Sequence, residues 1–109
     1  QVCDQALVHL SNVLRQAVRP SDVVARYGGE EFVILLPATR GEDAETVMAR
    51  VQRELTRRYF LHNHERLLVT FSAGVTERTE GELPSVLMER ADRALYRAKE
   101  LGKNRVVVQ

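Results

Sequence analysis

The feature that most constrains the fold is a glycine pair, Gly28 and Gly29, set between two β-rich runs of sequence. The second run is strongly apolar and closes at Pro37. Glycine accepts the positive φ angles that a two-residue turn between antiparallel strands requires. Residues 22–36 are therefore predicted to form a β-hairpin.

Two carboxylates, Glu30 and Glu31, follow the glycine pair directly. Neighbouring side chains of a strand point to opposite faces, so only one of the two can face a core. A turn without side chains leaves room for a large ligand, and carboxylates are hard oxygen ligands of the kind that Mg²⁺ prefers. The alternative is an acidic hairpin edge that discourages aggregation, and these residues alone leave both interpretations open.

Apolar residues recur at helical spacing in three segments, residues 2–18, 41–55 and 84–98. Pro84 opens the third segment, and Gly102 suits the left-handed position after a helix C-terminus. Strands are predicted at residues 67–75 and 105–108, and a polar break at residues 61–65. This order of elements predicts an α+β fold with helices packed on a mostly antiparallel central sheet.

Composition limits the class of protein. The chain has 109 residues, 44% of them hydrophobic, which suits one small domain with a core. A net charge of +1 provides no large field for nucleic acid. The single cysteine excludes an internal disulfide, and no apolar run approaches the roughly 20 residues that span a bilayer. We therefore expect a soluble, cytoplasmic domain that binds no nucleic acid.

Several conspicuous side chains are predicted to carry no chemistry. The three histidines, His9, His62 and His64, lack a shared third ligand and are expected to be exposed to solvent. Cys3 has no adjacent histidine and acid, so a structural role is expected. Tyr96 is predicted to lie in the core.

Three motifs in order resemble the GGDEF family, the diguanylate cyclases. The hairpin carries the family's motif in its Gly-Gly-Glu-Glu-Phe form, residues 70–75 resemble its central strand, and residues 91–105 resemble its closing motif. The resemblance covers nearly the whole chain. It implies a nucleotide-cyclase-like palm fold that lacks its first strand within residues 1–109.

The resemblance implies a role for each matching residue of the active site. Glu30 falls on the metal-binding catalytic acid, and Glu31 on the acid that supports the metal and the attacking 3′-hydroxyl. Gly28 and Gly29 would adjoin the substrate. Asp4 falls on the aspartate that contacts guanine, although it is also an ordinary acid of a first helical turn.

Two lysines complete the implied substrate site. Lys99 and Lys103 fall on the cations that contact phosphate, and Lys103 replaces the usual arginine, which keeps the charge but loses the bidentate fork. Both lysines would favour a helix C-terminus in any protein.

A second site is implied ahead of the hairpin. Arg19 and Asp22 resemble the family's inhibitory Arg-x-x-Asp pair, which binds the product, cyclic di-GMP, and Arg50 falls where a second arginine is often supplied. Arginine and aspartate can hydrogen-bond guanine edges and phosphates. The alternative is a surface ion pair worth ~0–1 kcal/mol.

The implied reaction condenses two GTP molecules into cyclic di-GMP and two pyrophosphates, with Mg²⁺ or Mn²⁺ as cofactor. Two domains must meet with two-fold symmetry, so a homodimer is expected, with an upstream sensory or regulatory domain as its control. The alternatives are an inactive GGDEF domain that serves as a receptor for cyclic di-GMP or GTP or as a dimerisation module, and a general α+β ligand-binding module. Because the resemblance puts other ligands upstream, residues 1–109 alone are expected to be poorly stable and inactive.

Overall fold

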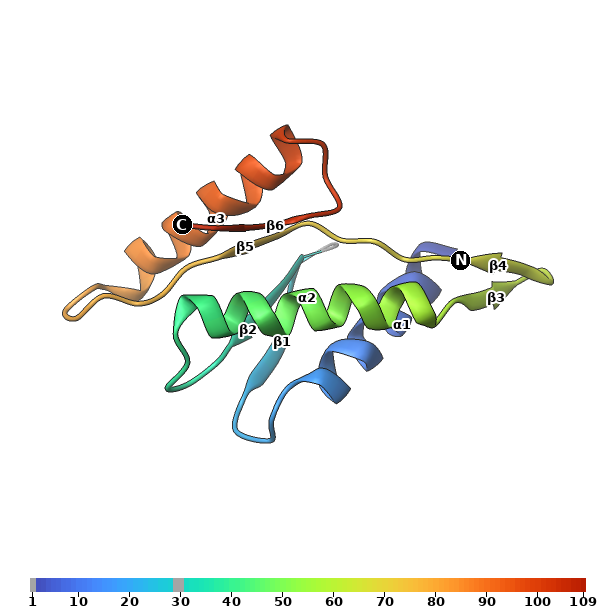
Figure 1. Ribbon diagram of the computed structural model, residues 1–109, viewed down its shortest axis with the longest axis horizontal. Helices are drawn as coiled ribbons and strands as arrows, with labels where there is room; N and C mark the ends of the chain where they lie inside the picture. The colour runs from blue at the N-terminus through green and yellow to red at the C-terminus, as the bar shows by residue number, and fades with distance from the viewer. Residues whose placement is uncertain (1, 29–30) are drawn as a thin grey trace. The chain divides into compact units, whose positions relative to one another are not determined.

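The computed structural model describes residues 2–28 and 31–109, which divide into two compact units. Unit 1 contains the described residues up to Ala38 together with Arg50–Val69, and unit 2 contains Thr39–Ala49 and Thr70–Gln109. Figure 1 labels the elements, which are α1 (Val2–Ala17), β1 (Val23–Gly28), β2 (Glu31–Leu35), α2 (Gly41–Arg57), β3 (Phe60–His62), β4 (Glu65–Leu67), β5 (Ala73–Val75), α3 (Pro84–Glu100) and β6 (Val106–Val108).

The three predicted helices are confirmed, each with its ends within two residues of the expected bounds. In α1 the apolar face buries Leu10, Val13 and Leu14, while the part of α2 in unit 1 buries Val51 and Leu55. These positions recur at three- and four-residue intervals, the spacing that lines one side of a helix. Burial of these stripes therefore accounts for the helices of unit 1.

The predicted hairpin is also confirmed. β1 and β2 pair antiparallel from Val23 opposite Leu35 to Arg26 opposite Phe32. The register then shifts, so that Gly28 lies opposite Glu31. Such an irregularity bends and twists the strand that carries it. The acid at the start of β2 is thus held next to the last residue of β1.

The polar stretch predicted as a break is instead a second hairpin. β3 and β4 pair antiparallel, and His62 lies opposite Glu65. Between them Asn63 and His64 have φ angles of 50° and 66°. Positive φ at both central residues is typical of the tight turn that matches the twist of a hairpin.

The strand predicted over residues 67–75 is wrong as one continuous element. β4 ends at Leu67 and β5 begins at Ala73, because β4 pairs with β3 whereas β5 pairs in parallel with β6. The α+β class is confirmed, and two of the three described strand pairs are antiparallel. The described strands form three two-stranded sheets, where the sequence predicted one central sheet.

In unit 2, β5 packs tightly on α3. A Cβ atom at Gly74 would lie 2.3 Å from the backbone nitrogen of Leu95 and 2.4 Å from the carbonyl oxygen of Ala91. Val75, Ala94 and Ala98 are buried around this contact. Only glycine allows so close an approach of strand and helix.

The end of α3 confirms the predicted cap. Gly102 has a φ of 118°, and its N–H donates to the carbonyl of Lys99 at 3.3 Å. The N–H of Lys103 donates to the carbonyl of Ala98 at 3.0 Å. This pair of bonds is the Schellman motif, in which a left-handed glycine satisfies the last carbonyls of a helix.

Candidate functional site

One of the two predicted catalytic acids, Glu31, lies at the start of β2 in the β1–β2 hairpin. Glu31 is the first residue of β2 and is exposed. Gly28 ends β1 opposite it. Gly29 and Glu30 lie outside the described residues, so their predicted roles rest on the sequence.

Asp4, the predicted guanine contact, lies in the first turn of α1. Its side chain is exposed, so it is accessible to a ligand. Unit 1 therefore contains both Asp4 and Glu31.

The structure brings Arg19 and Asp22 together. The backbone N–H of Arg19 donates to Oδ2 of Asp22 at 2.8 Å, and Arg19 Nη2 lies 3.3 Å from Oδ1. Nη2 also donates to the carbonyl of Pro37 at 3.0 Å, which joins the two ends of the hairpin. The Arg19 side chain is 58% exposed and that of Asp22 only 3%. One partner is thus accessible while the other is enclosed.

The pKa of the Asp22 carboxyl is lowered from its ordinary value. The main cause is the hydrogen bond from the backbone N–H of Arg19; the guanidinium of the same residue adds to it, and burial works in the opposite direction. The backbone donor does not depend on the side chain at position 19. Asp22 therefore keeps its principal partner when Arg19 is substituted.

Arg50 lies in the same unit, in α2. Its Nη2 donates to the carbonyl of Ala17 at 2.6 Å, at the last residue of α1. A cation at this position satisfies an end carbonyl and complements the helix dipole. The arginine also lines a pocket of about 90 Å³, together with Val13, Gln16, Ala17, Glu54 and Arg58.

Lys99 and Lys103 lie at the C-terminal end of α3, in unit 2. Both are exposed. Lys103 has a φ of 63°, and its N–H makes the longer-range hydrogen bond of the Schellman motif. The capped helix end thus presents two cations to solvent.

The chemistry of the hairpin residues suits a divalent cation, because carboxylate oxygens are the ligands that Mg²⁺ prefers. Glu31 is a carboxylate of this kind, and it is exposed. Within residues 2–28 and 31–109, no three or more histidine, cysteine, aspartate or glutamate side chains group as a metal site. The described part of the chain therefore holds no complete ligand set for a metal ion.

Two expectations for other side chains are wrong. His9 and His62 were expected to be exposed but are half-buried, with ring nitrogens hydrogen-bonded to Arg58 and Gln5. Tyr96 was expected in the core but is 65% exposed. Position in the sequence did not indicate that neighbouring segments cover the two histidines, or that Tyr96 lies on the exposed side of α3.

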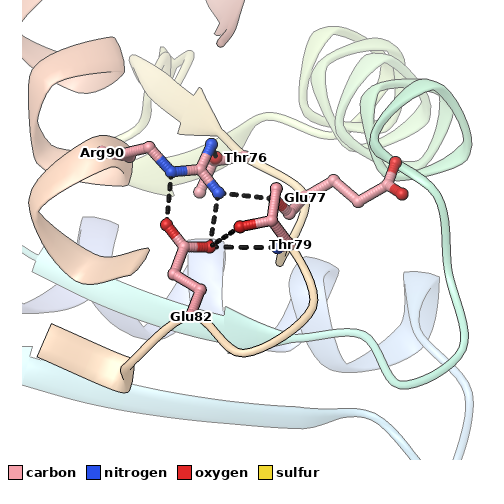
Figure 2. Close-up of polar contacts among 5 residues, drawn as sticks. All are labelled: Thr76, Glu77, Thr79, Glu82 and Arg90. Atoms are coloured by element: carbon pink, nitrogen blue, oxygen red, sulfur yellow. Dashed lines mark hydrogen bonds and ion pairs between the residues drawn. The ribbon is translucent and has the colours of Figure 1, made fainter. Parts of the chain in front are cut away.

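A network that the sequence did not indicate ties the loop after β5 to α3 (Figure 2). Arg90 of α3 forms a bidentate pair with Glu82, with Nε–Oε2 at 2.6 Å and Nη2–Oε1 at 2.7 Å. The same guanidinium donates to the hydroxyl of Thr76 and to the carbonyl of Glu77. The backbone N–H of Thr79 donates to Glu82 at 3.0 Å. One arginine thus organises the loop between strand and helix.

Glu77 extends this network to α2. Its Oε1 accepts a hydrogen bond from the backbone N–H of Gly41 at 2.8 Å. Gly41 is the first residue of α2, where a carboxylate satisfies a free N–H and complements the helix dipole. The loop after β5 therefore contacts both helical segments of unit 2.

Replacing Glu82 by Gln is expected to lower the free energy of unfolding at pH 7. The hydrogen bond from Arg90 is the largest cause that lowers the pKa of Glu82 from 4.5 to about 2. A depressed carboxyl pKa stabilises the fold above about pH 4.5, and this contribution is lost as the pH falls towards 2. Urea unfolding at pH 7 and pH 3 should show a deficit that shrinks in acid.

The neighbouring Glu80→Gln is the matched control, because Glu80 is exposed in the same loop. It should leave the free energy of unfolding near the parent value at both pH values. A Glu82→Gln deficit that is the same at pH 7 and pH 3 would mean that the ionised pair does not stabilise this loop.

No helix in the part of the chain that the structure describes combines the length and apolar character needed to cross a bilayer.

Residues 1–105 match the family described as "Diguanylate cyclase, GGDEF domain". The chain is 41% identical over 105 residues to diguanylate cyclase DgcP of Pseudomonas aeruginosa, covering 96% of this chain and 16% of that protein. It is 39% identical over 107 residues to the response regulator PleD of Caulobacter vibrioides, covering 95% and 24%. The chain thus spans less than a third of these relatives.

Two solved structures are similar over nearly the whole chain. Diguanylate cyclase SiaD of Pseudomonas aeruginosa, in complex with its activator SiaC, has a TM-score of 0.90 at 40% identity, covering 97% of this chain and 41% of that one. The GGDEF domain of DgcB from Caulobacter crescentus, in complex with c-di-GMP, has a TM-score of 0.90 at 34% identity, covering 96% and 63%. By its sequence and its fold, the chain therefore belongs to the GGDEF domain family of diguanylate cyclases.

Proposed function

We propose that the protein is a diguanylate cyclase, which condenses two GTP molecules into cyclic di-GMP. The observation that carries the proposal is the β1–β2 hairpin, which sets Glu31 opposite Gly28 in a chain whose relatives are named diguanylate cyclases. In the reaction each 3′-oxygen attacks the α-phosphorus of the other nucleotide. The bond from that phosphorus to the β-phosphate breaks, and two pyrophosphates leave.

In this proposal the acidic side chains bind the metal ion and the base, and the basic side chains bind the phosphates. Glu30 and Glu31 would hold Mg²⁺ or Mn²⁺ as oxygen ligands, and Gly28 and Gly29 would leave room for the nucleotide. When bound, the cation polarises the α-phosphate and lowers the pKa of the attacking hydroxyl. Asp4 would accept hydrogen bonds from guanine.

The exposed cations at the end of α3 suit phosphate groups by their charge. Lys99 and Lys103 would neutralise the phosphates and the leaving pyrophosphate. Each domain would hold one GTP, so synthesis requires two domains related by two-fold symmetry. We further propose that residues 1–109 are the larger, C-terminal part of the domain, controlled by a regulatory domain elsewhere in the protein.

Incubation of the full-length protein with GTP and Mg²⁺, followed by product chromatography, tests the central proposal. We expect cyclic di-GMP and pyrophosphate in a ratio of one to two. Binding of cyclic di-GMP without any synthesis would contradict it and favour an inactive receptor domain.

The paired Arg19 and Asp22 would form a product-binding site apart from the hairpin turn. The exposed guanidinium suits a guanine edge or a phosphate, and the enclosed Asp22 holds it in place. Arg50 could join them only by releasing the carbonyl of Ala17. Feedback follows if bound product favours an arrangement in which the two half-sites cannot meet.

Replacing Arg19 by Ala is expected to weaken cyclic di-GMP binding about 10- to 100-fold, the range for hydrogen bonds to charged groups. Initial turnover should stay near the parent rate, with less slowing as product accumulates. Asp22 keeps its bond from the backbone N–H of residue 19, so the loop should remain folded. Calorimetry and progress curves measure the two effects.

The control is Arg53→Ala, which removes an exposed arginine one turn along α2 from Arg50. It should leave product affinity unchanged. Equal affinities in the Arg19→Ala variant and the parent protein would reduce the Arg19–Asp22 pair to a surface ion pair.

A further inference from the structure

One face of α1 carries a strip of three polar side chains, Gln5, His9 and Gln16. Their spacing of four and seven residues places them on the same side of the helix. Two of them contact Arg58, which follows α2, and the third contacts His62, the last residue of β3. Gln5 Oε1 lies 2.9 Å from Nδ1 of His62, His9 Nε2 lies 2.9 Å from the carbonyl of Arg58, and Gln16 accepts from the Arg58 guanidinium.

An aromatic contact reinforces this strip. The rings of His9 and Phe60 have centroids 5.5 Å apart at an interplanar angle of 41°. α1 and β3 pack against each other within unit 1, and the ribbon shows them as neighbours (Figure 1). Contacts at several levels of the helix fix both its rotation and its position along its axis.

The proton positions follow from the acceptors. A carbonyl oxygen can only accept, so His62 must donate from Nδ1 to Gln5 and His9 must donate from Nε2 to Arg58. His62 therefore acts as a donor that joins the β3–β4 hairpin to α1, and His9 as a donor that joins α1 to the residue that follows α2. Neither is placed to ligate a metal with these nitrogens, because both protons are engaged.

The contact between Gln5 and His62 lies next to Asp4, the residue predicted to contact guanine. Gln5 directly follows Asp4, and both lie in the first turn of α1. The first turn of a helix frays easily, because its N–H groups lack partners within the helix. The bond from His62 ties this turn to the neighbouring hairpin.

We infer that the β3–β4 hairpin, through His62, positions Asp4 for recognition of guanine. This inference rests on the proposed function, since Asp4 reads guanine only if GTP is the substrate. His62 is a positioning residue: it acts on Gln5 and, through the helix turn, on Asp4. Recognition of the base would then depend on a residue of β3, a segment outside the active-site motifs.

The test compares GTP with inosine triphosphate in the full-length protein. The inosine base lacks the 2-amino group, one of the donors that a carboxylate accepts from guanine. His62→Ala should raise the KM for GTP about 2- to 10-fold, the range for loss of one hydrogen bond, with little change in kcat. The preference for GTP over inosine triphosphate should narrow by a similar factor.

Two further variants separate loss of the hydrogen bond from any other effect of a substitution in this hairpin. His62→Asn should restore the parent KM and preference, because the amide nitrogen of asparagine stands where Nδ1 of histidine does. His64→Asn is the matched control: His64 is exposed at the tip of the same hairpin, and asparagine accepts its positive φ. Thermal midpoints of all variants separate loss of stability from loss of recognition.

An unchanged KM and preference in His62→Ala would overturn the inference and leave the proposed function intact. So would an equal rise of KM for both nucleotides, which indicates a general loosening. If the parent protein binds GTP without forming product, the proposed function fails, and calorimetric affinities for the two nucleotides test the inference in the same way. A parent protein that binds no GTP would overturn both.

Discussion

Replacing Glu30 by Gln is expected to abolish synthesis of cyclic di-GMP, with a loss of ~1000-fold or more. The amide keeps the size of the side chain but removes the charged oxygen that a divalent cation needs. Metal ions supply several kcal/mol of transition-state stabilisation in phosphoryl transfer, and each 1.36 kcal/mol corresponds to about a tenfold change in rate. Product chromatography with GTP and Mg²⁺ measures the effect in the full-length protein.

The same substitution should hardly change the thermal midpoint, because a carboxylate at a hairpin edge contributes little to stability. Glu45→Gln is the control, since it removes the same charge from an exposed position of α2. It should leave both synthesis and stability unchanged. If Glu30→Gln still produces cyclic di-GMP at a rate near that of the parent, Glu30 is not the catalytic acid.

Replacing Gly74 by Ala is expected to destabilise the fold by roughly 3 kcal/mol or more, the upper range for overpacking. The added Cβ would lie 2.3 Å from the nitrogen of Leu95, 2.4 Å from the oxygen of Ala91 and 2.9 Å from the carbonyl carbon of Ala94. All three are backbone atoms of α3, so relief requires the strand and the helix to separate. Thermal or urea unfolding of the protein would show the loss, at roughly 12 °C or more in midpoint.

The control for Gly74 is Gly41→Ala in the same unit. A Cβ at Gly41 would have its nearest neighbours at 3.6 Å, an ordinary contact distance, and the residue begins α2. Replacing glycine by alanine at a compatible helical position stabilises a protein by ~0.4–1 kcal/mol. The two variants should therefore shift stability in opposite directions. A Gly74→Ala midpoint equal to that of the parent would show that β5 and α3 do not approach so closely.

Local chemistry determined much of this fold in advance. The helices formed where apolar residues recur at helical spacing, because that spacing gathers them on one face of a helix that packing can bury. Gly102 adopted the predicted left-handed cap, and Gly28 ended the first strand of the predicted hairpin. The family motifs at the hairpin and at residues 91–105 also identified the fold family, which the comparison confirmed.

Strands were harder to predict, because a strand forms only when it pairs with another strand, and the local sequence does not indicate which segment that is. The apolar run at residues 67–75 has strand character throughout, but only its ends found partners, β3 for Leu67 and β6 for the segment beginning at Ala73. The hairpin turn at Asn63 and His64 was missed for a related reason. Its strands are only three residues long, too short to show alternation.

Tertiary structure alone decided the polar contacts between distant segments. Glu77 meets the N–H of Gly41 across 36 positions of sequence, and His62 meets Gln5 across 57. No local pattern encodes such a pair, since it depends on where two separately formed elements pack. The sequence by itself determined the helices, their caps and the acids of the hairpin; packing decided which side chains are enclosed, how β5 meets α3 at Gly74, and what holds the first turn of α1.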